Sequence, residues 1–128
     1  MRRDSRLLVG LTIALVFISA PHAAEDFQYG EFGRAGIKTI VAGAILGALY
    51  ALQAYGCVLA GRGDPTAAVV LGLAGAIWCV GAVLIHGSEV LAPGPYREGW
   101  ISKTLVVAIV LLGASLAGLA VLQRGTKQ

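Results

Sequence analysis

Charged side chains are scarce in this chain of 128 residues. Asp, Glu, Lys and Arg make up 13% of the sequence and hydrophobic residues 57%, whereas ordinary soluble domains contain about 25% charged residues. Seven acids and ten bases are too few to cover a water-soluble fold of this size. The sequence therefore predicts an integral membrane protein, and its length leaves room for one domain.

The sequence also has no run of basic residues beyond its first six positions. Its formal net charge is +3, but most of the bases are scattered along the chain. Scattered bases are typical of charges that orient a protein in a membrane, and a nucleic-acid site requires them to be clustered. We therefore expect membrane lipid as a partner and no direct contact with nucleic acid.

Cysteine is rare as well, with Cys57 and Cys79 as its two occurrences. Measured from the turn predicted between them, their depths in the membrane differ by ~14 Å at 1.5 Å per residue. A disulfide requires Cα atoms within about 7 Å of each other. Two thiols without neighbouring His or acidic residues are also too few for a zinc site. Both cysteines are predicted to be buried small hydrophobes, and no metal site and no cofactor are expected.

The sequence also lacks the groupings of residues that form known kinds of catalytic site. No Ser or Thr has a His and an acid arranged to activate it, so no catalytic residue is assigned and the chain is not expected to be an enzyme. His86 and Glu89 form a His–acid pair that suits proton relay or metal binding. They fall where a predicted span meets a loop, which favours a solvated helix end. The predicted spans of the mature chain contain no charged residue in their interior, and this argues against an ion-coupled transporter.

Residues 1–24 have the features of a signal sequence. Three arginines precede a fourteen-residue apolar stretch at 7–20, which is shorter than the ~20 residues that a span requires. Small residues before Glu25 predict cleavage after Ala24. If the segment is not cleaved, it becomes a marginal first span that extends through Ala24. The next residues, 25–36, are polar with interleaved aromatic rings, which suits the membrane interface.

The remaining residues, 25–128, predict an all-α membrane domain with spans near 37–60, 65–86 and 101–122. The first two spans form a helical hairpin because a short turn of glycine, polar residues and proline separates them. The proline-containing segment before Trp100 separates the third span from this hairpin. The turn residues to which we assign a role are Arg62, Asp64 and Pro65.

The predicted orientation places the mature N-terminus outside the cytoplasm, in the inner membrane of a bacterium. After cleavage, three Lys or Arg residues lie inside and four outside, so the positive-inside rule does not decide the topology. The N-terminal arginines, which precede the apolar stretch of the signal sequence, decide the predicted topology.

Small residues recur at four-residue spacing in the predicted spans. Gly43 and Gly47 form a GxxxG pattern in the first span, and Gly72 and Ala76 continue a similar ridge in the second. Lipid offers no hydrophobic incentive for helices to associate, so they pack by close backbone approach across small residues. These ridges pack the helices of one subunit or join subunits. Because three helices cannot bury every such face, assembly into a homo-oligomer or with other membrane subunits is favoured.

The hairpin resembles the conjugative pilins of type IV secretion systems. The resemblance lies in a Gly-Arg turn followed by a helix rich in Gly, Ala and Val, which here are Gly61-Arg62, residues 69–77 and residues 80–82. With Asp64, Pro65 and Thr66 at the start of its second helix, the hairpin also looks like a small signal-bearing inner-membrane subunit of the Dot/Icm-type branch. The third span departs from pilins, which keep two mature helices, and favours a component that stays in the membrane.

The resemblance implies a pilin-like, non-enzymatic structural subunit of a type IV secretion or conjugation apparatus. The alternative is a small accessory subunit of a membrane transporter or respiratory complex. In that alternative, Cys57 or Cys79 binds a metal, and Gln53 and His86 line a path through the membrane.

Overall fold

A computed structural model describes residues 3–97 and 99–125 of the chain. Every regular element in this part is a helix, which confirms the predicted all-α class. The five helices are α1 (Arg3–Tyr29), α2 (Glu31–Arg34), α3 (Thr39–Gly61), α4 (Ala67–Leu91) and α5 (Trp100–Gly125).

Four of the described helices, α1, α3, α4 and α5, are long and apolar enough to cross a membrane. This agrees with the predicted multi-pass membrane protein. The first of them includes the described part of the segment expected to be a signal sequence, and its candidate span runs from Ser5 to Tyr29. The expected cleavage site after Ala24 lies within this continuous helix, and cleavage stays a prediction.

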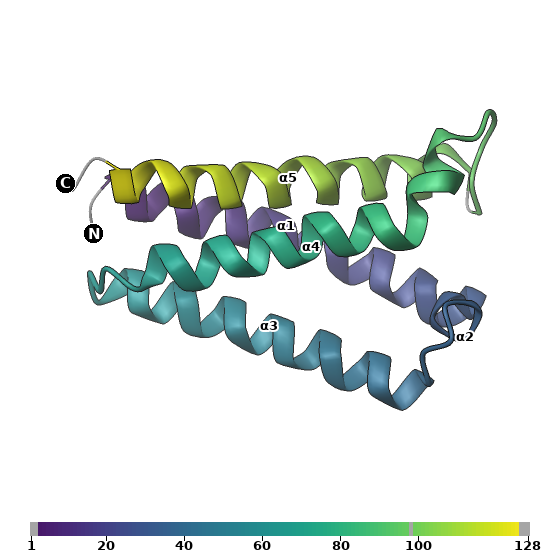
Figure 1. Ribbon diagram of the computed structural model, residues 1–128, viewed down its shortest axis with the longest axis horizontal. Helices are drawn as coiled ribbons and strands as arrows, with labels where there is room; N and C mark the ends of the chain where they lie inside the picture. The colour runs from purple at the N-terminus through teal and green to yellow at the C-terminus, as the bar shows by residue number, and fades with distance from the viewer. Residues whose placement is uncertain (1–2, 98, 126–128) are drawn as a thin grey trace.

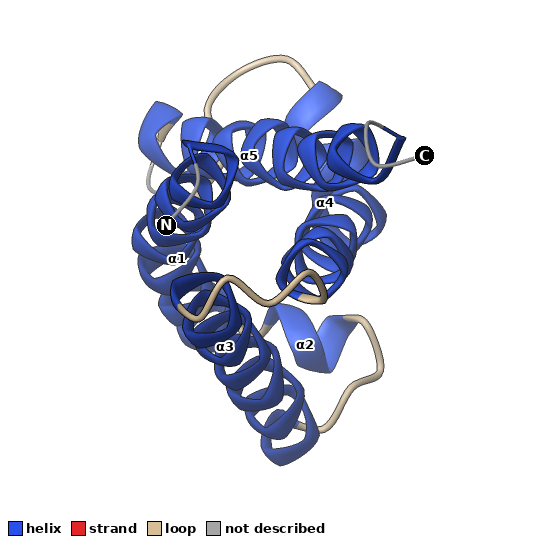
Figure 2. Cartoon of the chain, turned by 90° about the vertical axis from the view of Figure 1, so that its left-hand side faces the viewer, coloured by secondary structure: helices blue, strands red, loops and turns tan. Residues whose placement is uncertain are grey.

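The four long helices lie side by side, with the chain ends and the α3–α4 turn at one end (Figure 1). The short helix α2 and the loop between α4 and α5 lie at the opposite end. Viewed end-on, α5 lies beside α1 and α4, and α3 lies on the far side of the bundle from α5 (Figure 2). Helices α3 and α4 diverge from their turn toward the end that carries α2.

Helix α4 extends five residues beyond the predicted span 65–86 and ends at Leu91. It stops there because Ala92 precedes Pro93, and a residue before proline is disfavoured in the helical conformation. Ala92 is accordingly extended, with φ −63° and ψ 145°. His86 and Glu89 therefore belong to a helix and not to the loop at its end.

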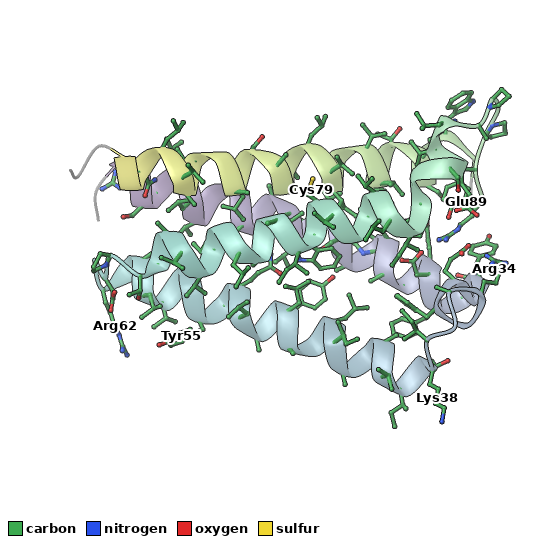
Figure 3. All side chains as sticks on the ribbon, in the orientation of Figure 1. Arg34, Lys38, Tyr55, Arg62, Cys79 and Glu89 are labelled. Carbon is green, nitrogen blue, oxygen red and sulfur yellow. The ribbon has the colours of Figure 1, made fainter. Side chains whose placement is uncertain are left out.

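The turn between α3 and α4 contains the three residues predicted for it. Asp64 Oδ1 accepts hydrogen bonds from the backbone N of Thr66 at 2.8 Å and from the Thr66 hydroxyl at 2.7 Å. These bonds hold the pKa of the Asp64 carboxyl below its usual value. Arg62 and Pro65 are exposed, and Figure 3 shows Arg62 pointing away from the bundle.

One face of α1 is buried from Leu8 to Asp26. Apart from Ala23, its buried positions are separated alternately by four and three residues, the spacing of helices that pack lengthwise against partners. They are Leu8, Thr12, Leu15, Ser19, His22 and Asp26. The Thr12 hydroxyl donates to the Leu8 carbonyl at 2.8 Å, and the Ser19 hydroxyl lies 3.1 Å from the Tyr50 hydroxyl on α3. The N-terminal segment thus packs as a member of the bundle.

Helices α4 and α5 are in close backbone contact where Gly75 faces Gly113. A Cβ atom added to Gly75 would lie 2.7 Å from the Gly113 carbonyl oxygen, and one added to Gly113 would lie 2.6 Å from the Gly75 carbonyl oxygen. Because both obstacles are backbone atoms, only glycine fits at this crossing.

The residues predicted to pack helices together lie in different surroundings. Gly72 is buried, and a Cβ there would come within 2.5 Å of Ala120 Cβ on α5. Ala76 is half-buried. Gly47 is exposed, with no described atom within 4 Å of an added Cβ, and Gly43 is exposed beside the ring edge of Phe27 at 3.9 Å. The ridge of α4 therefore packs inside the subunit, whereas that of α3 faces outward.

We predict opposite effects of two Gly→Ala substitutions. Gly75→Ala should destabilise the folded protein by about 1–3 kcal/mol, because the new methyl group collides with the α5 backbone. Gly118→Ala should be neutral or stabilising by up to about 1 kcal/mol, since alanine favours a helix and a Cβ at this position meets no described atom within 4 Å. Unfolding in detergent measures both, and equal stability of the two variants would contradict the proposed crossing.

Candidate functional site

Ionisable side chains gather at the end of the bundle that carries α2. We call this group the polar cluster. Its members come from α1, α2, α4 and the α4–α5 loop, and they are His22, Glu25, Asp26, Glu31, His86, Glu89, Tyr96 and Arg97. His22 lies ~10 Å from the end of α1, and His86 lies ~7 Å from the end of α4, at 1.5 Å per residue. The cluster is therefore near one membrane interface.

The guanidinium group of Arg97 joins the loop to α1 and α2. Its Nη1 donates to Asp26 Oδ1 at 2.6 Å, and its Nη2 lies 2.6 Å from Glu31 Oε1. All three side chains are nearly inaccessible, with 5% to 7% of their surface exposed. The Arg97 guanidinium also lies over the ring of Tyr96, 4.5 Å from its centre.

Glu31 pairs with a second arginine, Arg34, at the rim of the cluster. Burial acts to raise the pKa of Glu31, but its contacts with Arg34 and Arg97 outweigh this and hold the pKa below the usual value. Glu31 is thus an anion in the folded protein. Figure 3 shows Arg34, Lys38 and Glu89 at this end of the molecule, with Arg62 at the other.

Two imidazoles and one carboxylate converge at the centre of the cluster. Asp26 Oδ2 lies 3.7 Å from His22 Nε2 and 3.4 Å from His86 Nε2. The two imidazole rings are in edge contact, with centres 4.8 Å apart. His22, Asp26 and His86 are at most 5% exposed.

The other nitrogen of each imidazole faces a carboxylate one helical turn further along the same helix. His22 Nδ1 lies 3.5 Å from Glu25 Oε2, and His86 Nδ1 lies 3.7 Å from Glu89 Oε2. His86 Nδ1 is also 3.1 Å from the Tyr96 hydroxyl. Burial and a hydrogen bond with Glu89 raise the pKa of Tyr96, so Tyr96 keeps its proton.

An apolar cavity of about 140 Å³ adjoins the two imidazoles and Asp26. Helix α3 supplies much of its wall, through residues such as Leu46 and Leu49, and α4 supplies Trp78 and Ile85. Trp78 Nε1 donates to Gln53 Oε1 at 3.1 Å further along the bundle. Gln53 lines a different cavity from the one beside His86.

Sequence reasoning missed this site. His22 was assigned to a signal sequence, and the expectation that His86 is a solvated helix end is wrong, because His86 is 2% exposed and faces α1. A usable signal was present in the four–three spacing of α1, which passes through His22 and Asp26. The cluster contains neither cysteine, and both are free thiols.

Ser102 on α5 lies beside the acids of the cluster, and its hydroxyl donates to Glu25 Oε1 at 3.1 Å. The arrangement is suited to holding a proton or a cation between α1 and α4.

Comparisons with protein-family models, curated proteins and solved structures found no match to this chain.

Replacing Arg97 should test the electrostatic core of the cluster. Arg97→Met leaves Asp26 without its guanidinium partner and Glu31 with Arg34 alone, and we expect a loss of about 3–5 kcal/mol of unfolding free energy. Arg34→Met is the matched control, because Arg34 is 62% exposed and pairs with one of the same acids. A much smaller loss is expected for the control. Similar losses for the two variants, measured by unfolding in detergent, would show that burial of Arg97 is not important.

Proposed function

We propose that the protein is a non-enzymatic structural subunit of a type IV secretion or conjugation apparatus, resident in the bacterial inner membrane. It acts by assembling with copies of itself or with other membrane subunits through α3. The exposed small-residue face of α3 is the observation that carries this proposal.

That face consists of glycine and alanine residues, which leave the helix backbone accessible. They are Gly43, Ala44, Gly47, Ala48 and Ala51, and all five are exposed. The corresponding ridge of α4 is occupied by α5 at Gly72 and Gly75. Since helices in lipid associate where small residues permit close backbone contact, α3 offers the surface on which a neighbouring helix can pack.

The resemblance of the α3–α4 hairpin to conjugative pilins, through Gly61-Arg62 and the helix that follows, supports a place in this kind of machinery. Four membrane-length helices among the described residues favour a component that stays in the bilayer over one that is extracted into a filament.

Helix α1 is proposed to stay attached as the first span, with its N-terminus in the cytoplasm. Its continuous buried face from Leu8 to Asp26 supports this proposal. The polar cluster then lies on the outer side of the membrane, as does the segment after Ala24.

The distribution of basic residues agrees with this four-span topology. Six Lys and Arg residues are then cytoplasmic, and these are Arg2, Arg3, Arg6, Arg62, Arg124 and Lys127. Four are on the outer side, and these are Arg34, Lys38, Arg97 and Lys103.

A second candidate function is an accessory subunit of a membrane transporter or respiratory complex. The buried group of His22, Asp26 and His86 favours it, because ionisable residues enclosed within a membrane protein mark functional sites more often than structural ones. Loss of conjugation or secretion on deletion of the gene supports the first candidate. Loss of a transport or respiratory activity with secretion intact supports the second.

Substitution on α3 should separate assembly from folding. Gly47→Leu is expected to reduce cross-linked oligomers at least tenfold in membranes while leaving the thermal stability of the subunit unchanged, because no described atom lies within 4 Å of the new Cβ. Gly118→Leu, on an exposed face of α5, is the control and should leave the oligomers intact. Normal cross-linking of the Gly47→Leu protein would overturn the assigned interface.

The mass of the protein isolated from membranes should report the fate of α1. We expect a product that still contains residues 5–24. A product that begins at Glu25 would show that the segment is a cleaved signal sequence and that the mature protein has three spans.

A further inference from the structure

We propose that His22, Asp26 and His86 bind a divalent first-row transition-metal ion, with Zn²⁺ as the best fit, and that this ion holds α1 against α4. The inference rests on the part of the proposed function in which α1 stays attached. It does not depend on assembly through α3.

The three ligand atoms already lie near the positions that a metal ion requires. They are all within 4.8 Å of one another. Bonds of ~2.0–2.1 Å to a tetrahedral zinc ion place its N and O ligands ~3.3 Å apart. The distances from Asp26 Oδ2 to the two Nε2 atoms, 3.4 and 3.7 Å, are close to that separation. Small rotations of the imidazoles bring the set to coordination distance.

The buried imidazole of His22 lacks hydrogen-bond partners among the described residues. It is 3% exposed, yet neither of its ring nitrogens has a hydrogen bond within the described part of the chain. A buried polar group without a partner typically costs about 1–3 kcal/mol. A metal ion bound at Nε2 supplies the missing interaction, and the coordinated ring then donates from Nδ1 toward Glu25.

Each of the three proposed ligands has an outer partner beside it. Glu25 faces Nδ1 of His22, and Glu89 and Tyr96 face Nδ1 of His86. Asp26 accepts a hydrogen bond from Arg97 at Oδ1, and its Oδ2 faces the two histidines. Metal-binding histidines nearly always donate their second N–H to a carboxylate or a similar acceptor, so this arrangement is the one expected around a metal.

The charge of the cluster favours a cation. With neutral histidines, its four carboxylates, on Glu25, Asp26, Glu31 and Glu89, are opposed within the cluster by Arg97 alone, and by Arg34 at the rim. The excess negative charge sits in a largely buried place, where a divalent cation compensates it more strongly than in water.

The chemical nature of the three ligands determines which metal ions fit the site. Two imidazole nitrogens are unsuited to Ca²⁺ and Mg²⁺, which prefer oxygen ligands throughout. Two histidines and one carboxylate suit Zn²⁺, or Fe²⁺ with open positions. Because the site borders the apolar cavity, we infer that the fourth coordination position faces that cavity and takes water or a small ligand.

The experiment uses the full-length protein in detergent, without a polyhistidine tag, freed of metal with a chelator and titrated with ZnCl₂ by calorimetry. One Zn²⁺ per chain is expected, together with an increase in Tm. His22→Asn and His86→Asn should each weaken binding at least 100-fold. Glu25→Gln should weaken it 10- to 100-fold, as outer-shell changes do. The Cys57→Ser/Cys79→Ser protein is the control and should bind as the wild type does.

X-ray absorption of the zinc-loaded wild type provides a test that needs no variant. The chain has two histidines in all, so scattering from two imidazoles assigns both His22 and His86. Sulfur scattering, oxygen ligands alone or the absence of stoichiometric binding overturns the proposal, as does unchanged binding by the His22→Asn/His86→Asn protein. A chain that begins at Glu25 also overturns it, because His22 is then lost, whereas oligomers lost on Gly47→Leu substitution would still support assembly through α3.

Discussion

The ion pairs that Arg97 makes with Asp26 and Glu31 determine the arrangement of one end of this protein. Arg97 belongs to the loop between α4 and α5, Asp26 to α1 and Glu31 to α2. Charges this far from water are tolerated only when they are paired, so these segments must meet wherever Arg97 is buried. Arg97 even adopts a positive φ of 46°, which is unusual for a residue other than glycine. The same contact holds the C-terminal part of α1 against α4, and this brings His22 beside His86.

Close packing of α4 on α5 provides the second constraint, of a different physical kind. Gly75 and Gly113 allow the two backbones to touch, so these helices form a pair with no space between them at the crossing. Helix α3 has no such crossing in its N-terminal half, where Gly43 and Gly47 face away from the bundle. This difference explains why the apolar cavity lies between α3 and its neighbours and why α3 presents the surface that we propose for assembly.

The general architecture could be predicted from the sequence because it depends on properties that are local along the chain. Long apolar stretches in lipid must form helices, since no water is present to satisfy the backbone. Pro93 also limits how far α4 can extend, because the residue before a proline is disfavoured in the helical conformation. The sequence alone predicts an end at residue 86, five residues short of the observed one. The packing partner of each glycine could not be predicted from the sequence. Gly47 and Gly72 have similar neighbours along the chain, but Gly47 is exposed and Gly72 is buried against α5.

The sequence by itself determined that this chain is a helical membrane protein with a polar turn at residues 61–65 and a proline-bounded loop before Trp100. Hydropathy, proline and glycine act within a few residues, so these features need no knowledge of the fold. Only the tertiary structure decided that His22, Asp26 and His86 form one buried group, because 60 residues separate the last two and nothing local links them. Their contact follows from how α1 lies beside α4, where Asp26 pairs with Arg97 from a loop that is distant from α1 in the sequence.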